Sequence, residues 1–336
     1  MSSQTPQPLR YLPEAAAQFE AAASRMRGAS KVSVVAHIKP DADAIGSACA
    51  LAFGLRKLGV DVQVLIGQPL PHSANMRTIP GVDEILYDEP LPADGLVVTV
   101  DCASADRTGA LMPAILRDPS RVVVVDHHNT NPGFGGINVI VESESTTVMV
   151  RELLGYLGVD LDADIAYGLY AGLVTDTGSF RWGTPRMHEF AAELMQFGLD
   201  TRQIALDLMD TMSPVDLQLM GAVLAKTQIV PTKGLAVAVL TIPAGIHSRM
   251  SQTAVEAIID YARSLEGTDV GVVLKEQTPK YWAMSLRSTA VDVSAVAQRL
   301  GGGGHWAAAG YSATGSRNQV IRELLDAFPE PPASNV

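Results

Sequence analysis

The stretch Val122-Val123-Val124-Val125-Asp126-His127-His128 places four valines directly before an acid and two imidazoles. Short Val-rich runs are typical of strands that are buried on both faces of a parallel sheet. Two other runs end in a similar way: Val32 to Ala36 stops at His37, and Leu96 to Val100 stops at Asp101. Because ligands bind beyond the carboxyl ends of the strands in open α/β sheets, we expect these polar side chains to converge on one site.

The composition limits what this site can bind. The chain has 336 residues, of which 47% are hydrophobic, so it can bury large cores and is predicted to hold two domains. Its formal net charge of -11 argues against a long duplex nucleic acid as partner, because such affinity depends mainly on Lys and Arg side chains that neutralise phosphates. Small anionic substrates fit this charge if metal ions supply a local positive field.

The sequence also predicts the compartment. Cys49 and Cys102 are its only cysteines, too few for a disulfide framework and compatible with a reducing cytosol. The start, Met1 to Pro13, has neither a basic n-region nor an apolar h-region, so no secretory signal is expected. No apolar run approaches the roughly 20 residues that span a bilayer. We predict a cytoplasmic protein that does not bind a membrane.

The order of strand-like and helix-like segments predicts an α/β fold. Strands and helices alternate up to Asp126, which indicates a parallel sheet with flanking helices. The chain then turns helical from Ser145 to about Met220, and strands return from Gly234. We therefore expect a parallel-sheet domain, a helical linker and a smaller α/β domain, over residues 1–205, 206–230 and 231–330.

The segment His37-Ile38-Lys39-Pro40-Asp41-Ala42-Asp43 contains three possible metal ligands. A bare Asp-x-Asp is usually a cap or turn feature, and Asp43 could cap a helix that begins near Ile45. The alternative is a metal site, because His37 ends a strand and Pro40 holds the loop away from helix. Hard oxygen donors together with imidazole suit Mn, Mg or Fe(II) more than structural zinc.

Further acids make the metal site the better explanation. Asp101 and Asp126 each end a Val-rich strand, where an acid is costly to bury unless it is paired or coordinates a metal. Asp176 ends a largely apolar helix, a position that disfavours negative charge and therefore needs a cation. A carboxylate beside His127 and His128 is natural at such a site, because ligating imidazoles commonly use one to fix their tautomer.

Candidate phosphate-binding residues lie mainly in the second domain. The run Gly301-Gly302-Gly303-Gly304 before His305 could be a flexible linker or a loop whose bare amides approach a phosphate. Arg287 ends a predicted strand and is either a fork-shaped phosphate clamp or an ordinary surface arginine. Arg107, six residues after Asp101, is a weaker candidate of the same type.

These motifs, in this order from about Lys31 to about Ala327, resemble the DHH phosphoesterase family with its DHH-associated C-terminal domain. Within the family, the modest length most resembles the bifunctional oligoribonucleases and phosphoadenosine-phosphate phosphatases of the NrnA type. The motifs that carry the resemblance are His37-x-x-Pro40-Asp41-x-Asp43, Asp101, Asp126-His127-His128, Thr175-Asp176-Thr177-Gly178 and Gly301 to His305 followed by Ala308-Ala309-Gly310.

The resemblance implies a cluster of two divalent metal ions, usually Mn²⁺ with Mg²⁺ as the alternative. One ion would be held by His37, Asp41 and Asp101, and the other by Asp43, Asp101, His127 and Asp176. Asp126 would orient His127, while His128 would contact the scissile phosphate or the leaving group. The active cleft would lie between the two domains, and the substrate-binding residues would be Arg107, Arg287, Ser288, Gly302, Gly303, Gly304 and His305.

The expected function is that of a hydrolase acting on very short oligoribonucleotides, including linear dinucleotides such as pApA, and on nucleoside bisphosphates such as 3′-phosphoadenosine 5′-phosphate. Cyclic di-AMP phosphodiesterase activity is one alternative, and a catalytically silent nucleotide sensor is another. The loop Gly301 to His305 argues against the related inorganic pyrophosphatases, whose C-terminal domain differs. A homodimer is expected if the Met- and Leu-rich helices between Leu194 and Leu224 form an interface, although ordinary core packing is the simpler explanation of these helices.

Overall fold

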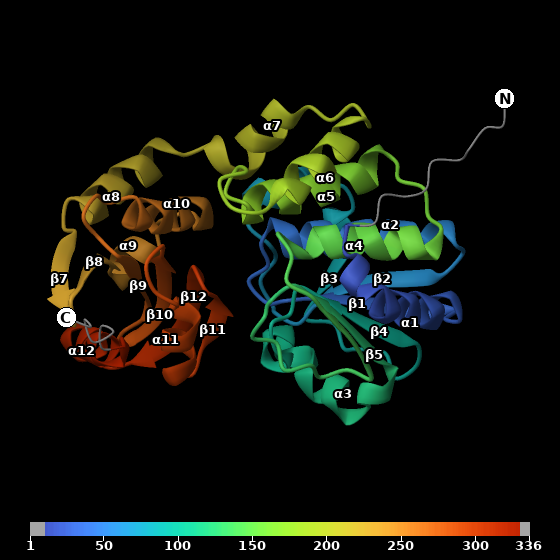
Figure 1. The fold of residues 1–336 in the computed structure, drawn as a ribbon, viewed down its shortest axis with the longest axis horizontal. Helices are drawn as coiled ribbons and strands as arrows, with labels where there is room; N and C mark the ends of the chain where they lie inside the picture. The colour runs from blue at the N-terminus through green and yellow to red at the C-terminus, as the bar shows by residue number, and fades with distance from the viewer. Residues whose placement is uncertain (1–10, 330–336) are drawn as a thin grey trace, which may run out of the picture. The chain divides into compact units, whose positions relative to one another are not determined.

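The chain divides into two compact units, and the boundary along the sequence lies between Asp210 and Thr211 (Figure 1). The computed structural model describes residues 11–329. Residues 1–10, which include most of the predicted non-secretory start, lie outside the described residues. Among the helices of residues 11–329, none combines the length and the apolar character that crossing a membrane requires.

The first unit is built on a six-stranded sheet in which every neighbouring pair of strands is parallel. The strand order is β3-β2-β1-β4-β5-β6. The strands are β1 (Lys31–Ala36), β2 (Asp61–Ile66), β3 (Ile85–Tyr87), β4 (Leu96–Val100), β5 (Val122–Asp126) and β6 (Ile137–Ile140). The predicted parallel-sheet domain is confirmed.

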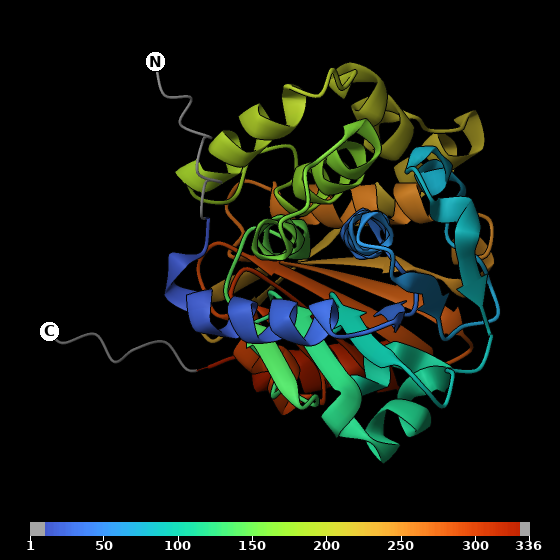
Figure 2. The ribbon, with the colours of Figure 1, turned by 90° about the vertical axis from the view of Figure 1, so that its right-hand side faces the viewer.

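Helices cover both faces of this sheet, which explains why its central strands β1, β4 and β5 are Val-rich (Figure 2). Side chains such as Val34 and Val98 pack in a core with α1, α2, α4 and α5. Their neighbours Val35 and Val97 point to the opposite face and pack with Leu111 and Ile115 beside α3. The helices of this unit are α1 (Ala16–Arg27), α2 (Ala42–Lys57), α3 (Met112–Arg117), α4 (Thr146–Leu157), α5 (Ala163–Asp176), α6 (Pro185–Met195) and α7 (Thr201–Ala205).

Helix α2 begins earlier than the sequence suggests. It starts at Ala42 rather than near Ile45, and its cap is Asp41, whose carboxylate accepts a hydrogen bond from the amide of Ala44 at 3.0 Å. The alternative role of Asp43 as the helix cap is therefore excluded. Since Asp41 already occupies the capping position, Asp43 lies in the first turn of the helix, and its carboxylate turns to other partners.

Helices α2 and α5 approach each other closely through glycines. A Cβ atom at Gly46 would lie 2.1 Å from the carbonyl oxygen of Gly168, and one at Gly172 would lie 2.6 Å from an oxygen of Asp43. Only glycine allows such a close approach of two backbones. The contact brings the start of α2 and the end of α5 to the same edge of the sheet, so that Asp43 and Asp176 meet there.

The second unit has a mixed sheet of six strands in the order β11-β12-β10-β9-β8-β7, in which β8 and β9 are parallel and the other pairs are antiparallel. Its strands are β7 (Gln228–Thr232), β8 (Leu235–Ile242), β9 (Val270–Thr278), β10 (Tyr281–Ser288), β11 (Gly303–His305) and β12 (Ala308–Thr314). Its helices are α8 (Pro214–Leu224), α9 (Ala244–His247), α10 (Gln252–Arg263), α11 (Val293–Arg299) and α12 (Arg317–Ala327). The predicted smaller α/β domain is confirmed.

The glycine run of this unit differs from the predicted loop. Residues 303–305 form strand β11, which pairs antiparallel with β12. A Cβ atom at Gly302 would lie 2.1 Å from the carbonyl oxygen of Gly310, so part of the run is glycine because two backbones pack tightly. Gly301 and Gly304 have φ values of 81° and 139°, which L side chains rarely adopt.

The glycine contact between α2 and α5 gives the first prediction. Replacement Gly46→Ala should lower the free energy of unfolding by about 1–3 kcal/mol, because the added methyl group must displace the backbone of α5. Urea denaturation of the wild type and the variant measures this change. Gly28→Ala is the matched control, since its Cβ atom would meet its nearest neighbours at an ordinary 3.8 Å. Equal losses in both variants would contradict the packing argument.

Candidate metal centre

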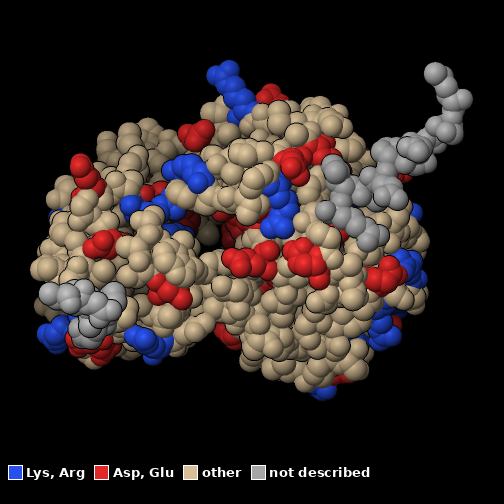
Figure 3. All heavy atoms as spheres, in the orientation of Figure 1, with Lys and Arg blue, Asp and Glu red and all other residues tan. Residues whose placement is uncertain are grey.

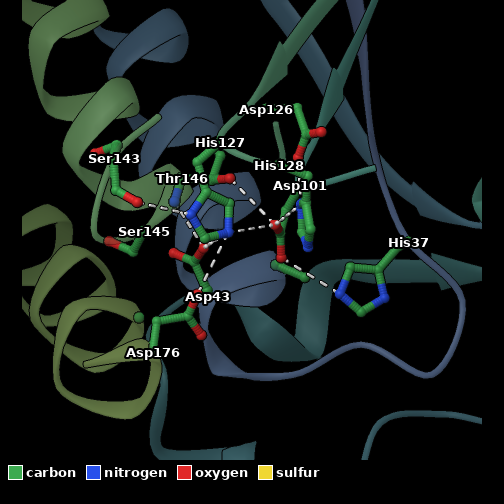
Figure 4. A network of polar contacts seen from close by, with 12 residues as sticks. His37, Asp43, Asp101, Asp126, His127, His128, Ser143, Ser145, Thr146 and Asp176 are labelled. Carbon is green, nitrogen blue, oxygen red and sulfur yellow. Dashed lines mark hydrogen bonds and ion pairs between the residues drawn. The ribbon is translucent and has the colours of Figure 1, made fainter. Parts of the chain in front are cut away.

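The carboxyl ends of three neighbouring strands carry the predicted acids and imidazoles to one edge of the first unit (Figure 4). His37 follows β1, Asp101 follows β4, and Asp126 ends β5, directly before His127 and His128. Helix α2 supplies Asp43 from its first turn, and α5 supplies Asp176 as its last residue. Asp43, Asp101 and Asp126 are buried, and so are His37 and His127.

The first group of potential ligands contains His37, Asp41 and Asp101. The Nε2 atom of His37 lies 3.6 Å from Oδ2 of Asp41 and 3.3 Å from Oδ2 of Asp101. One nitrogen and two oxygens thus point toward a common position.

The second group contains His127, Asp43 and Asp176. The Nε2 atom of His127 lies 3.9 Å from Oδ2 of Asp43 and 3.4 Å from Oδ2 of Asp176. It is also 3.5 Å from Oδ1 of Asp101. Because the other oxygen of Asp101 faces His37, a single carboxylate joins the two groups, as expected for a ligand that bridges two ions.

Asp101 reaches this position at a conformational cost. Its φ is 57°, a left-handed value that is uncommon for residues other than glycine. Its amide still donates to the carbonyl oxygen of Val125 at 3.0 Å, which ties the turn to β5. Strained residues of this kind cluster at functional sites.

Helix α4 holds the carboxylates in place. Asp43 accepts hydrogen bonds from the amides of Thr146 at 2.7 Å and Thr147 at 3.0 Å, at the start of the helix. The positive end of the helix dipole favours a carboxylate there. The hydroxyl of Thr146 donates to Oδ1 of Asp101 at 3.1 Å. Thr146 therefore orients two carboxylates, that of Asp43 through its amide and that of Asp101 through its hydroxyl.

Backbone carbonyls orient the two ligand imidazoles. Nδ1 of His37 lies 2.9 Å from the carbonyl oxygen of Ile38, and Nδ1 of His127 lies 3.1 Å from that of Ser143. When Nδ1 donates to a carbonyl, Nε2 is directed at the carboxylates, as in many metal-bound histidines. The predicted residue Arg107 is also placed here, because its guanidinium lies 3.1 Å from Nδ1 of His37.

Asp126 orients His128 and not His127, contrary to the role that the resemblance implied. Oδ1 of Asp126 lies 2.9 Å from Nδ1 of His128, and Oδ2 accepts a hydrogen bond from the side-chain amide of Asn131, Nδ2, at 2.7 Å. The reason is the alternation of side chains along an extended chain, in which residues two apart share a side. Asp101, Asp126 and His128 also offer three grouped ligand atoms, but the direct contact marks Asp126 and His128 as a hydrogen-bonded pair.

The electrostatics of the site call for added positive charge. Burial raises the pKa of Asp43 well above its usual range, and the charges of Asp101 and Asp41 raise it further. Burial opposes the protonation of His37, yet the charge of Asp41 and hydrogen bonds to Asp101 and Asp41 raise its pKa to about 10. The proton of His37 thus occupies the place that a cation would take, and metal binding commonly releases such protons.

The donor set therefore fits a pair of divalent cations. Buried carboxylates, correctly oriented imidazoles and one shared carboxylate form clusters of the kind that hold such ions. Thr146 and Asn131 stand outside the predicted set of site residues. The Thr146 hydroxyl orients the ligand Asp101, and the side-chain amide of Asn131 orients Asp126. No strand end marked either residue, although Thr146 lies at the start of a predicted helix.

The other predicted residues lie in the second unit. Arg287 is in β10, opposite Gly271 and Ala308, and donates to the carbonyl oxygen of Leu286 at 3.1 Å. Ser288 is buried, and its hydroxyl donates to the backbone carbonyl oxygen of Asp269 while it accepts from the backbone amides of Ala290 and Val291. A structural role thus accounts for its hydroxyl. Gly302, Gly303, Gly304 and His305 lie at and in the hairpin of β11 and β12.

Comparisons with known proteins agree with this organisation. Residues 31–173 match the DHH family, N-terminal domain, and residues 233–330 match the DHHA1 domain. The bifunctional oligoribonuclease and PAP phosphatase NrnA of Thermus thermophilus is 32% identical over 308 residues, which cover 89% of each chain. Its namesake from Bacillus subtilis is 27% identical over 289 residues, which cover 82% of this chain and 87% of that one. An exopolyphosphatase-related protein from Bacteroides fragilis shares the fold, with a TM-score of 0.79 and 23% identity over 93% of this chain and 95% of that one.

Metal addition should stabilise the protein. At a Mn²⁺ concentration about 100 times the dissociation constant, binding contributes about 2.7 kcal/mol, which raises the melting temperature by roughly 5–10 °C for a unit of this size. Calorimetry of protein treated with EDTA, before and after MnCl₂ addition, measures the shift. Asp101→Asn should respond far less, because the amide leaves an oxygen for only one ligand group, places an NH₂ before the other and removes the negative charge. A full rise in this variant would argue against a shared ligand.

Thr146 provides a finer test of ligand orientation. Thr146→Val keeps the shape of the side chain but removes the hydroxyl that donates to Asp101, so Mn²⁺ affinity should fall about 10- to 100-fold. Thr146→Ser keeps a hydroxyl and should bind Mn²⁺ nearly as the wild type does. Electron paramagnetic resonance of free Mn²⁺ during titration reports both affinities. If Thr146→Val bound Mn²⁺ with wild-type affinity, the hydroxyl would have no role in orienting the ligands.

Proposed function

The chain belongs to the DHH family of metal-dependent phosphoesterases, and from that premise we propose that it hydrolyses very short oligoribonucleotides to nucleoside 5′-monophosphates. Linear dinucleotides such as pApA are included among the substrates. The observation that carries the proposal is the carboxylate of Asp101, whose two oxygens face the two ligand groups. That arrangement suits displacement at a phosphorus atom, where both the attacking and the leaving oxygen need stabilisation.

The proposed mechanism assigns a separate task to each group of residues. Two divalent ions, Mn²⁺ by preference, would lower the pKa of an attacking water and neutralise charge on the phosphoryl group. The ions would be held by His37, Asp41, Asp43, Asp101, His127 and Asp176. Attack of water on phosphorus then breaks the bond to the leaving oxygen.

His128 is the proposed proton donor to that leaving oxygen. Its Nδ1 atom is fixed by Asp126 at 2.9 Å, which leaves Nε2 as the atom that can meet the substrate. Burial opposes protonation, but the hydrogen bond and charge of Asp126 raise the pKa of His128 above its ordinary value. This shift favours the protonated form, which a general acid needs.

The preference for short substrates rests on three features. The two NrnA proteins, from Thermus thermophilus and Bacillus subtilis, are described as oligoribonucleases. Lys and Arg side chains lie scattered among Asp and Glu on the face that Figure 3 shows, a pattern unlike the continuous basic surface that long nucleic acid requires. Arg287, Gly302, Gly303, Gly304 and His305 are proposed to bind the remainder of a short substrate, with Arg287 as a clamp on a second phosphate.

Removal of the 3′-phosphate from 3′-phosphoadenosine 5′-phosphate is a second proposed activity. The names of both relatives include PAP phosphatase. This molecule carries two phosphates on one nucleoside, so it presents one phosphate for cleavage and another for binding. The same residues would act on it without any change of mechanism.

A substrate panel with Mn²⁺ tests the proposal. Chromatography should show AMP released from pApA and phosphate from the bisphosphate, with rates that fall as RNA lengthens.

His128→Ala should lower kcat about 10²- to 10⁴-fold, the usual contribution of an acid catalyst, while Mn²⁺ affinity stays unchanged. His72→Ala is the matched control, since His72 contacts Tyr87 outside the centre and should behave as the wild type.

Two other outcomes would replace the proposal. Binding of pApA without release of AMP would establish a nucleotide sensor. Cleavage of cyclic di-AMP in preference to pApA would establish a cyclic dinucleotide phosphodiesterase.

A further inference from the structure

A short loop, residues 177–183, begins directly after the predicted ligand Asp176 and leads to α6. The loop closes back on its first residue. The carbonyl oxygen of Thr177 accepts hydrogen bonds from the amides of Arg181 at 2.9 Å and Trp182 at 3.1 Å, and the Thr177 hydroxyl accepts one from the amide of Phe180 at 3.0 Å. Trp182 is therefore held against the residue that follows Asp176.

The far end of the loop is tied to the second ligand group as well. Beyond Gly183, the amide of Thr184 donates to Glu144 at 3.1 Å, and Glu144 also binds Arg186 at 2.7 Å. Glu144 follows Ser143, whose carbonyl oxygen holds Nδ1 of His127. The loop thus begins next to the predicted ligand Asp176, and its far end binds Glu144, whose neighbour Ser143 contacts the predicted ligand His127.

The loop is fixed in an uncommon conformation. Gly178, Ser179 and Phe180 have φ values of 55°, 60° and 63°, and such values are costly for residues with a side chain. The Phe180 ring packs at 6.1 Å from Tyr170 and 5.6 Å from His188. The inner part of the loop is therefore anchored by packing, and its outer part can present a side chain rigidly.

Trp182 is the side chain presented. Its indole covers Gly178, where a Cβ atom would lie 2.2 Å from Nε1, and the guanidinium of Arg181 lies 5.0 Å from the ring centroid. The side chain nevertheless stays 38% exposed. An aromatic ring steadied by an arginine is a common surface for stacking nucleobases, because every base offers a π face.

We propose that Trp182 stacks on the nucleobase of the nucleotide whose phosphate lies at the metal centre. The inference rests on the proposed phosphodiesterase function and narrows its substrate class to phosphates that carry a base. Inorganic phosphates have no ring to stack and would gain nothing from Trp182. The residue thus acts in substrate recognition and takes no part in the bond-breaking step.

The test compares two ligands that differ only by the base. Calorimetry with MnCl₂ present gives dissociation constants of 5′-AMP and ribose 5-phosphate for the wild type, Trp182→Ala and Trp182→Phe. The wild type should prefer AMP by about 5- to 150-fold, the usual effect of one stacked base. Trp182→Ala should bind both ligands alike, and Trp182→Phe should keep most of the preference.

Leu58→Ala is the matched control. Leu58 is 43% exposed and follows the last residue of α2, roughly 24 Å along the helix from the centre at 1.5 Å per residue, and its variant should keep the wild-type preference. A Trp182→Ala protein that still prefers AMP, or a wild type without any preference, would overturn the inference. Hydrolysis of pApA is measured separately, so a failure of the proposed function would leave this comparison intact and readable.

Discussion

The buried carboxylate of Asp101 is the constraint on which the rest of the first unit depends. It lies at the end of a central strand, is 3% exposed, and faces further carboxylates from Asp41, Asp43 and Asp176 across two imidazoles. Negative charges at this density are unfavourable away from water unless cations neutralise them. The raised pKa values of His37 and Asp43 have the same cause, which is an excess of buried negative charge. A pair of divalent ions would neutralise this charge, and the donor groups that the strands and helices bring together are suited to hold them.

Several elements cooperate to hold the carboxylates in place. Parallel strands deliver His37, Asp101 and His127 to one edge of the sheet, and the start of α4 fixes Asp43 through two amides. The glycine contact between α2 and α5 lets Asp43 and Asp176 approach each other. From the same edge, the loop after Asp176 extends toward solvent and carries Trp182. Metal binding and base recognition would thus use one continuous segment of chain.

Much of this arrangement follows from sequence because strand ends are easy to recognise. Val-rich runs that stop on an acid or imidazole predicted the parallel sheet and the residues that the structure brings together. The start of α2 was less predictable, since either Asp41 or Asp43 could serve as its cap. The pairing of Asp126 with His128 depends on the direction of side chains after the strand. Thr146 acts on Asp43 through a backbone amide, which leaves no mark in a sequence, and on Asp101 through its hydroxyl, whose partner only the fold determines. Strand β11 forms from glycines that resemble a loop.

The central claim is that Asp101 lies between two ions and binds both. Anomalous X-ray scattering from crystals grown with MnCl₂ tests it most directly. The account predicts two manganese peaks about 3.5–4 Å apart, one beside His37 and the other beside His127, with an oxygen of Asp101 near each. A single peak, or manganese bound away from Asp101, would contradict it.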